Sequence, residues 1–207
     1  MPLFPAFLKL EGRLVLVIGG GAIATDKIPG LLHAGARVRV IAPQITPQIA
    51  EWVRNRRVDW LPKTFEPTDL QGAFLVIAAT SLRELNRSVF LASEKQGTLC
   101  NAVDDIDHCH FYYGSVLHRG DLQIAISTNG KSPALAQRLR LELEQQFGPE
   151  YAAWLEWLGA AREVLRAQSS GADAETAKRW LHLLASQPSF EEFRKHSRST
   201  SNTEGVS

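Results

Sequence analysis

Short apolar runs alternate with segments of helical character through about the first hundred residues. The runs that predict strands cover residues 14–18, 37–42, 58–61, 73–79 and 98–103. Helical patterns stand between them over residues 22–33, 46–54 and 82–96. The run at 73–79 contains no polar residue, which is typical of a strand covered on both faces. Strands and helices in this order predict right-handed βαβ crossovers and a parallel, doubly wound sheet.

The pattern changes after about residue 110. Residues 111–127 are strand-like, and their second half alternates polar and apolar positions as a half-exposed strand does. Ser132 and Pro133 then predict the start of a helix that extends to about Phe147. A strand pair followed by a helix differs in topology from the preceding βα repeats, so we expect a separate α+β segment here.

The C-terminal part is predicted to be helical. Amphipathic patterns cover residues 150–168 and 174–186, whereas residues 197–207 are small and polar and predict a disordered tail. The expected fold is therefore α/β, with a parallel-sheet domain followed by a small α+β segment and a helical region. The expected divisions are 1–110, 111–148, 149–196 and the tail at 197–207.

A glycine-rich motif joins the first predicted strand to the first helix. It consists of Gly19, Gly20, Gly21, Ala22, Ile23 and Ala24. In a Rossmann-like dinucleotide site, the first glycine allows a tight turn and the second lets the backbone approach a pyrophosphate. The final small residue lets helix and strand pack closely. The motif thus predicts dinucleotide binding, with a structural glycine turn as the alternative.

The end of the second predicted strand does not identify the dinucleotide. An acidic residue that binds ribose hydroxyls is expected about twenty residues after the glycines. This sequence has Ala42, Pro43 and Gln44 there. The choice between NAD and NADP is therefore open at this position.

Composition and charge exclude several classes of protein. The 207 residues are 44% hydrophobic and 22% charged, with a net charge of +1, which argues against a disordered chain and a globally basic nucleic-acid binder. The two cysteines, Cys100 and Cys109, are too few for a disulfide scaffold, and because they form no CxxC pair a four-ligand zinc site is not expected either. Because we find no basic leader and no apolar run of membrane-spanning length, we expect a soluble, cytoplasmic protein with no membrane partner.

Taken together, the motifs resemble the precorrin-2 dehydrogenase/sirohydrochlorin ferrochelatase family, which also forms the front module of bifunctional sirohaem synthases. The resemblance covers about residues 3–145. The matching elements are Gly19–Gly21 with Ala24 and Lys27, Ala34–Ala36, Ala42–Pro43, Ala78–Thr80 with Asn86, Cys100–Asp104, and Ile126–Pro133 with Arg138.

The resemblance implies oxidation of precorrin-2 to sirohydrochlorin by hydride transfer to NAD, and in some members insertion of ferrous iron into the product. It also implies a homodimer built by segment 111–148, with the tetrapyrrole bound between this segment and the Rossmann-like domain. The residues expected to bind NAD are Gly19, Gly20, Gly21, Ala22, Ile23, Ala24, Ala42, Pro43 and Thr80.

Asp104 is the expected catalytic residue. It follows an apolar strand, and ligands of open α/β sheets bind at the carboxyl ends of the strands. It also matches the aspartate that the family uses in both activities. A carboxylate there would accept the proton that the macrocycle loses while the nicotinamide takes the hydride. The alternative is an aspartate that caps a helix or a turn.

A polar loop before the helix at Pro133 is the expected substrate site. It consists of Ser127, Thr128, Asn129, Gly130, Lys131 and Ser132. Precorrin-2 is a polycarboxylate, and hydroxyls, backbone N–H groups and a lysine at a helix start suit anions. The alternative is an ordinary loop that ends in an N-cap serine.

Further polar residues crowd behind Asp104. Asp105, Asp107, His108, Cys109 and His110 suggest either ferrous-iron ligands or a polar loop at a domain junction, and we favour the loop. No resident metal site is therefore predicted. Two departures from the family pattern, Gly114 in place of a proline and the lack of acids at 80–82, affect the details of the tetrapyrrole site.

A second class of function is a non-enzymatic, NAD-binding regulatory module. Such a module would bind NAD without redox chemistry. It leaves Asp104 and the loop 127–133 unexplained, so we favour the enzyme.

Overall fold

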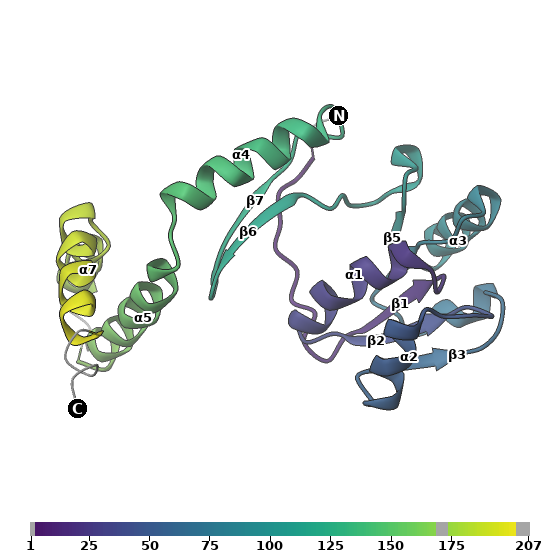
Figure 1. Ribbon diagram of the computed structural model, residues 1–207, viewed down its shortest axis with the longest axis horizontal. Coiled ribbons are helices and arrows are strands. Elements are labelled where there is room, and N and C mark those ends of the chain that lie inside the picture. Colours follow the sequence, from purple (N-terminus) through teal and green to yellow (C-terminus); the bar gives the residue numbers. More distant parts are fainter. Residues whose placement is uncertain (1–2, 169–173, 202–207) are drawn as a thin grey trace. The chain divides into compact units, whose positions relative to one another are not determined.

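The protein folds into two compact units, Met1–Tyr113 and Gly114–Ser207. Figure 1 shows the computed structural model, which describes residues 3–168 and 174–201. The change of unit at Tyr113 lies close to the boundary expected after residue 110. The further division of the second part into 111–148 and 149–196 stays a prediction.

The first unit alternates strands and helices along the chain, as the apolar runs predict. A short 3-10 helix, Pro67–Leu70, precedes β4, and another, Ile106–His108, follows β5. The principal elements are β1 (Leu14–Ile18), α1 (Ala22–His33), β2 (Arg37–Ile41), α2 (Pro47–Arg54), β3 (Val58–Leu61), β4 (Leu75–Ala78), α3 (Arg83–Gln96) and β5 (Leu99–Ala102).

The five strands form one parallel sheet in the order β3-β2-β1-β4-β5. Alternate residues of each strand point to opposite faces, so the sheet has two apolar cores. Val15 and Val17 pack with Ile28 of α1 and Ile49 of α2, whereas Leu16 packs on the other face with residues of α3. The expected doubly wound α/β fold is confirmed.

The strand order creates a crevice beside β1. The chain leaves β1 toward β2 on one side and later returns to β4 on the other side. At such a reversal the loops after the two flanking strands separate, which is where open α/β sheets bind their ligands. The glycine motif after β1 lies at this point.

The second unit begins with an antiparallel hairpin, β6 (Ser115–Arg119) and β7 (Leu122–Ile126), against which α4 (Pro133–Gln146) packs. Ser132 caps α4 as predicted, because its hydroxyl accepts a hydrogen bond from the Leu135 N–H at 3.2 Å. Arg119 ties the hairpin to the end of α4, since its Nε donates to the Phe147 carbonyl at 2.8 Å.

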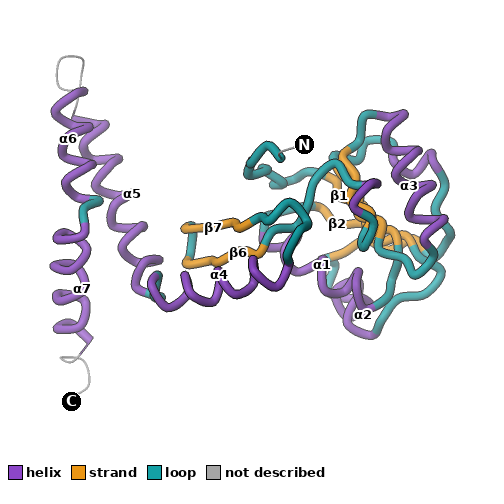
Figure 2. Tube along the Cα trace, turned by 90° about the horizontal axis from the view of Figure 1, so that it is seen from above, coloured by secondary structure: helices purple, strands orange, loops and turns teal. Residues whose placement is uncertain are grey.

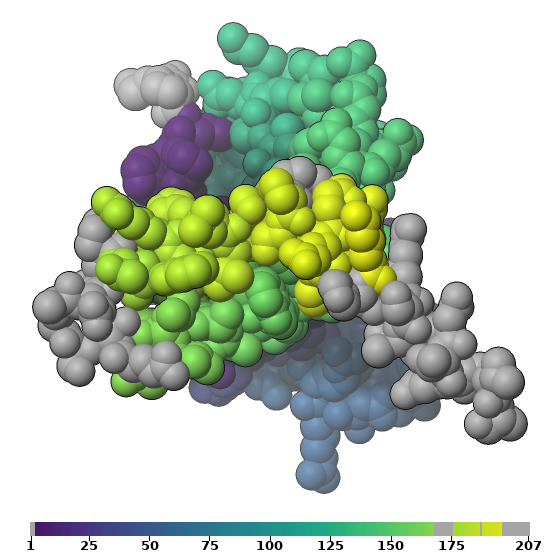
Figure 3. Space-filling model, turned by 90° about the vertical axis from the view of Figure 1, so that its left-hand side faces the viewer, coloured from purple at the N-terminus to yellow at the C-terminus, as the bar shows by residue number. Residues whose placement is uncertain are grey.

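Three helices complete the second unit: α5 (Glu150–Gln168), α6 (Ala174–Leu184) and α7 (Gln187–Ser201). In Figure 2, α6 and α7 follow one another along one side and α5 lies beside α6. Figure 3 shows a row of atoms from α6 and α7 in front of α5. Aromatic rings join α5 to α7: Phe190 of α7 contacts Tyr151 and Trp154 of α5, with ring centroids 4.3 Å and 4.8 Å apart.

Helix α7 corrects one prediction. Residues 197–201, assigned to a disordered tail, belong to this helix. Phe190 is buried against α5 and anchors the helix, which the polar composition of its C-terminal half concealed. The rest of the predicted tail, residues 202–207, lies outside the described residues. Within 3–168 and 174–201, no helix is both long and apolar enough to span a membrane.

Candidate active site

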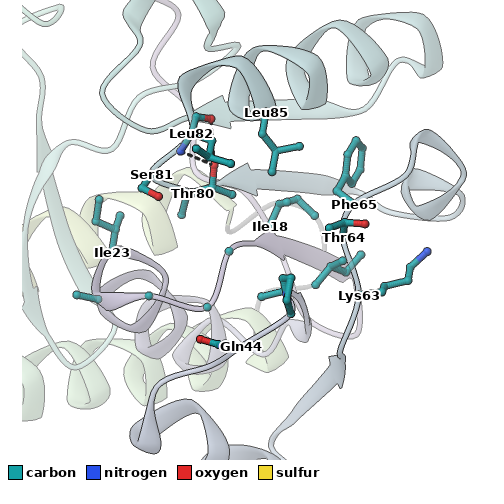
Figure 4. A pocket seen from close by; sticks show the side chains of 18 residues that line it. Ile18, Ile23, Gln44, Lys63, Thr64, Phe65, Thr80, Ser81, Leu82 and Leu85 are labelled. Atoms are coloured by element: carbon teal, nitrogen blue, oxygen red, sulfur yellow. Dashed lines mark hydrogen bonds between the residues drawn. The ribbon is translucent and has the colours of Figure 1, made fainter.

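A cavity of about 580 Å³ opens at the carboxyl ends of β1 to β4 (Figure 4). Its size is that of a small-molecule site, and its walls are largely apolar. Its lining comes from the loops after each strand: Ile18 to Ile23, Ile41 to Gln44, Lys63 to Phe65, Ala79 to Leu82, and Leu85. All the residues expected to bind NAD line it except Ala24, which is buried behind the loop and packs α1 onto the sheet.

The glycine loop is fixed by the backbone around it. Gly19 has a φ of +117°, and a Cβ at this position would collide with the Ala79 carbonyl. A Cβ on Gly20 would collide in the same way with the Gln44 carbonyl. Gly21 differs, because a Cβ there would meet nothing within 4 Å. Gly19 and Gly20 therefore allow the glycine loop to lie directly against the loops that carry Ala79 and Gln44. Gly21 leaves open space next to the start of α1.

The start of α1 suits a pyrophosphate. The N-cap Gly21 has no side chain to cap the first turn, whose N–H groups lack partners within the helix. Ala22 and Ile23 of this turn line the cavity. Backbone N–H groups and the helix dipole together favour a negatively charged group. The residues present thus fit the pyrophosphate of a dinucleotide.

Hydroxyl and amide groups hold the surrounding loops. The Thr25 and Thr46 hydroxyls lie 2.8 Å apart and connect α1 to the cap of α2. On the other side, Asn86 is 3% exposed, and its Oδ1 accepts from the Thr80 N–H at 3.1 Å and from the Thr80 hydroxyl at 2.7 Å. Its Nδ2 donates to the Thr80 carbonyl at 3.0 Å. Asn86 therefore fixes Thr80 at the edge of the cavity.

The far end of the cavity includes residues that the sequence analysis missed. Lys63, Thr64 and Phe65 follow β3 and line the cavity together with Leu82 and Leu85. The only sequence signal was their position after a strand at the carboxyl edge of the sheet. Phe65, Leu82 and Leu85 make an apolar wall of the kind that a flat base can pack on.

Lys63 is the only charged residue in the described lining. Its ammonium group lies 2.9 Å from Asp69 and 3.1 Å from Glu66. The hydrogen bond to Asp69, and then that to Glu66, raise the pKa of Lys63. Figure 4 shows the Lys63 side chain pointing away from the glycine loop.

Asp104 lies at the same edge of the sheet but outside the cavity lining. Ala78 of β4 and Ala102 of β5 are register partners, so Asp104 stands two residues beyond β5 as Thr80 stands two residues beyond β4. The Val103 N–H donates to the Ala78 carbonyl at 2.9 Å and continues this pairing. Asp104 is exposed and has a φ of +61°, which is uncommon for a residue with a side chain.

The predicted substrate loop belongs to the second unit. Its hydroxyls bind the loop's own backbone: Ser127 Oγ accepts from the Asn129 N–H at 3.2 Å, and Thr128 Oγ1 accepts from the Ser132 N–H at 3.1 Å. Lys131 is exposed, and Asn129 has a φ of +54°. This local bonding gives the loop a defined shape, and its substrate role stays a prediction.

The polar residues behind Asp104 do not form a common ligand set. His108 Nδ1 lies 2.8 Å from Asp105 Oδ2, whereas His110 Nε2 lies 2.5 Å from Glu94 Oε1 on α3. The two imidazole rings both contact Phe90. In the part of the chain that the structure describes, no three His, Cys, Asp or Glu residues are grouped so as to hold a metal ion.

Comparison with known families identifies the first unit. A family described as "Putative NAD(P)-binding" matches residues 6–115. The chain belongs to this NAD(P)-binding family. This membership confirms the predicted nicotinamide dinucleotide cofactor. A second family, described as "Sirohaem biosynthesis protein central", matches residues 119–146, which hold most of the hairpin and α4.

Two relatives of this NAD(P)-binding chain are named siroheme synthase. It is 41% identical to a siroheme synthase of Neisseria meningitidis serogroup B over 80% of its own length and 34% of the relative's length. With a siroheme synthase of Photorhabdus laumondii it shares 42% identity over 70% of its length and 31% of the relative's length. The chain therefore spans about a third of the curated relatives it matches. These matches confirm the resemblance inferred from the sequence motifs.

A solved structure matches nearly the whole fold. The structure titled "SirC, precorrin-2 dehydrogenase" aligns with a TM-score of 0.76 and 27% identity. The alignment covers 95% of this chain and 100% of that chain. The likeness therefore extends beyond the NAD(P)-binding unit into the hairpin and helices of the second unit.

Proposed function

We propose that the protein is an NAD-dependent precorrin-2 dehydrogenase that forms sirohydrochlorin in sirohaem biosynthesis. The observation that carries this proposal is the structural match to a precorrin-2 dehydrogenase over all of that chain and 95% of this one. The siroheme synthase relatives support the same pathway. The glycine loop and its cavity support a dinucleotide as the oxidant.

Residues of the first unit bind the cofactor in this proposal. Gly21 and the first turn of α1 hold the pyrophosphate, while the apolar wall of Phe65, Leu82 and Leu85 receives the adenine. NAD is favoured over NADP because Lys63, the charged residue of the described lining, is already paired with two carboxylates. When bound, the nicotinamide supplies the hydride acceptor.

Asp104 serves as the base. Oxidation of precorrin-2 to sirohydrochlorin removes two hydrogens, one as a hydride to NAD and one as a proton. The Asp104 carboxylate takes the proton, and its exposure lets that proton pass on to water. Asp104 follows β5 as Thr80 follows the neighbouring β4, and this position at the carboxyl edge of the sheet supports the role.

The second unit contributes the substrate loop and the dimer contact. We assign the carboxylates of precorrin-2 to the loop Ser127–Ser132, where Lys131 supplies a positive charge. Homodimer formation is supported by the two-stranded hairpin, since such a hairpin is marginally stable alone and α4 leaves Leu135 and Leu141 exposed. A cytoplasmic location stays a prediction that agrees with two free cysteines.

Anaerobic turnover tests the proposal. The protein is incubated with precorrin-2 and NAD, and the absorbances of NADH and sirohydrochlorin are followed together. Equal amounts of both products are expected. Binding of NAD without any oxidation of precorrin-2 would overturn the proposal and favour the regulatory module instead.

Iron insertion is a second candidate activity. The relatives named siroheme synthase favour it, because sirohaem is the iron complex of sirohydrochlorin. Ferrous iron would act here as a substrate. Supplying sirohydrochlorin with ferrous or cobaltous ions, without NAD, tests the chelatase step separately. Metal insertion faster than in a protein-free control is the expected result.

A further inference from the structure

The outer edge of the sheet at β5 is covered by the chain's own continuation. After Asp104 the chain turns through the short helix Ile106–His108 and returns antiparallel to β5, forming a bridge between Asn101 and Cys109. His110 then pairs with Cys100 twice. The His110 N–H donates to the Cys100 carbonyl at 2.8 Å, and the Cys100 N–H donates to His110 Nδ1 at 2.9 Å.

The second of these bonds is unusual because a side chain replaces a backbone carbonyl. Its geometry fixes the tautomer: Nδ1 must present a lone pair to the Cys100 N–H, so in the neutral ring the proton is on Nε2. Nε2 lies 2.5 Å from Glu94 Oε1 on α3 and donates to it. The ring also stacks on Phe90, with centroids 4.9 Å apart and planes inclined by 29°.

These contacts lie at the base of the loop 103–109, which contains Asp104. Within the loop, the Asp105 N–H donates to the Ala102 carbonyl at 3.2 Å, and Cys109 Sγ lies 3.1 Å from the same carbonyl. Asp104 itself has left-handed backbone geometry. A residue with a side chain keeps such geometry when the surrounding structure determines it.

We propose that His110 is a positioning residue that holds the Asp104 loop closed through its Nδ1 acceptor. The inference rests on the proposed function, since it assumes that Asp104 is the base. His110 itself need not touch substrate or cofactor. The specific claim is that the acceptor on the ring, rather than the ring's packing on Phe90, keeps Asp104 in place.

Two substitutions separate the acceptor from the ring. His110→Phe keeps an aromatic ring for stacking on Phe90 but leaves the Cys100 N–H without its partner. His110→Asn loses the ring but retains an oxygen close to the position of Nδ1. We expect H110F to lower kcat about tenfold or more, as small displacements of catalytic groups do, and to leave the KM for NAD within about twofold. We expect H110N to retain kcat within about threefold.

Hydrogen exchange provides a readout that does not depend on turnover. The Cys100 amide should exchange faster in H110F than in the wild type and remain protected in H110N. His182→Asn, a substitution at an exposed position on α6, is the matched control for loss of a histidine and should change neither readout.

The outcomes distinguish this inference from the proposed function. A wild-type protein that does not oxidise precorrin-2 contradicts the proposed function, and unchanged Cys100 exchange in H110F contradicts the hydrogen bond in the same samples. If the wild type is active, wild-type kcat in H110F overturns the positioning role. It is also overturned if H110N is as impaired as H110F, because the acceptor would then not be what matters.

Discussion

The two units differ in how much of their apolar surface they bury. Most strand residues of the first unit are inaccessible to solvent, and two cores fix the loops around the cavity. Among the described residues of the second unit, the buried hydrophobic ones are Leu117, Ala136, Trp154 and Phe190. The first unit is thus stabilised by its own interior, whereas the second leaves apolar side chains for another surface to cover. From this difference we expect the cofactor site in the first unit to be rigid and the proposed substrate site in the second unit to be adaptable.

The largest expected effect is a loss of activity caused by a substitution in the first unit. Asp104→Asn removes the proton acceptor, and asparagine tolerates the left-handed backbone that alanine would strain. We expect kcat for precorrin-2 oxidation to fall about 100-fold or more while NAD affinity stays within about twofold. Asp107→Asn in the same loop is the control and should retain activity. Steady-state kinetics and calorimetry measure the two quantities, and an active D104N would refute the role of the base.

Two glycine substitutions test whether the backbone defines the cavity. Gly19→Ala forces a Cβ into the Ala79 carbonyl at a φ of +117°, so we expect the free energy of unfolding to fall by about 1–3 kcal/mol. Gly21→Ala meets open space and should leave stability unchanged. Its methyl group would stand where the pyrophosphate approaches, so NAD affinity should fall about tenfold. Thermal unfolding and calorimetry separate the effects; equal behaviour of both variants would contradict this reading.

The substrate role proposed for the loop of the second unit is tested by charge reversal at Lys131. Lys131→Glu should weaken binding of the tetrapyrrole about twofold to fivefold, the range expected for one exposed charge contact, and leave NAD binding intact. Lys95→Glu, at an exposed position of the first unit, is the control. Fluorescence titration with sirohydrochlorin and with NAD measures both affinities. A parallel loss of the two affinities would show that the substitution disturbs the fold instead.

The exposed face of α4 is tested by Leu141→Glu. Leu141 is 46% exposed, and a carboxylate there would cost little in a monomer but would oppose burial between two copies. We expect a dimer for the wild type and a monomer for the variant, with unchanged NAD affinity. Light scattering coupled to gel filtration gives the two masses, and a variant that remains dimeric would exclude this face as the contact.

The smallest expected effect concerns the reactivity of the Cys100 thiol in the first unit. Burial raises the pKa of Cys100 to about 12, so its thiol stays protonated at pH 8 and reacts poorly with iodoacetamide. Because the thiolate forms only as pH approaches that value, the rate should rise with pH or with unfolding. Mass spectrometry of the alkylated peptide checks this expectation; rapid labelling of the folded protein at pH 8 would show that the interior opens.

Sequence patterns predicted the elements of the first unit well because its constraints are local. The strand pattern at 14–18 and the helical pattern at 22–33 each depend on neighbouring residues, and both elements stand where the patterns placed them. Lys63 and Phe65 could not be assigned to the cavity, because their place in it depends on the pairing of β3 with β2. Helix α7 was partly missed for a similar reason: Phe190 is buried only by its contact with α5.

The return of the chain along β5 has a consequence for solubility. An uncovered outer strand offers its amide and carbonyl groups to strands of other molecules, which is a common route to aggregation. Here the backbone N–H and carbonyl of Cys100 on β5 are both hydrogen-bonded to His110. The outer strand on the other side of the sheet, β3, carries the exposed charged side chain of Asp59. Loosening the Asp104 loop would therefore also make the protein more prone to assemble into insoluble β-structure.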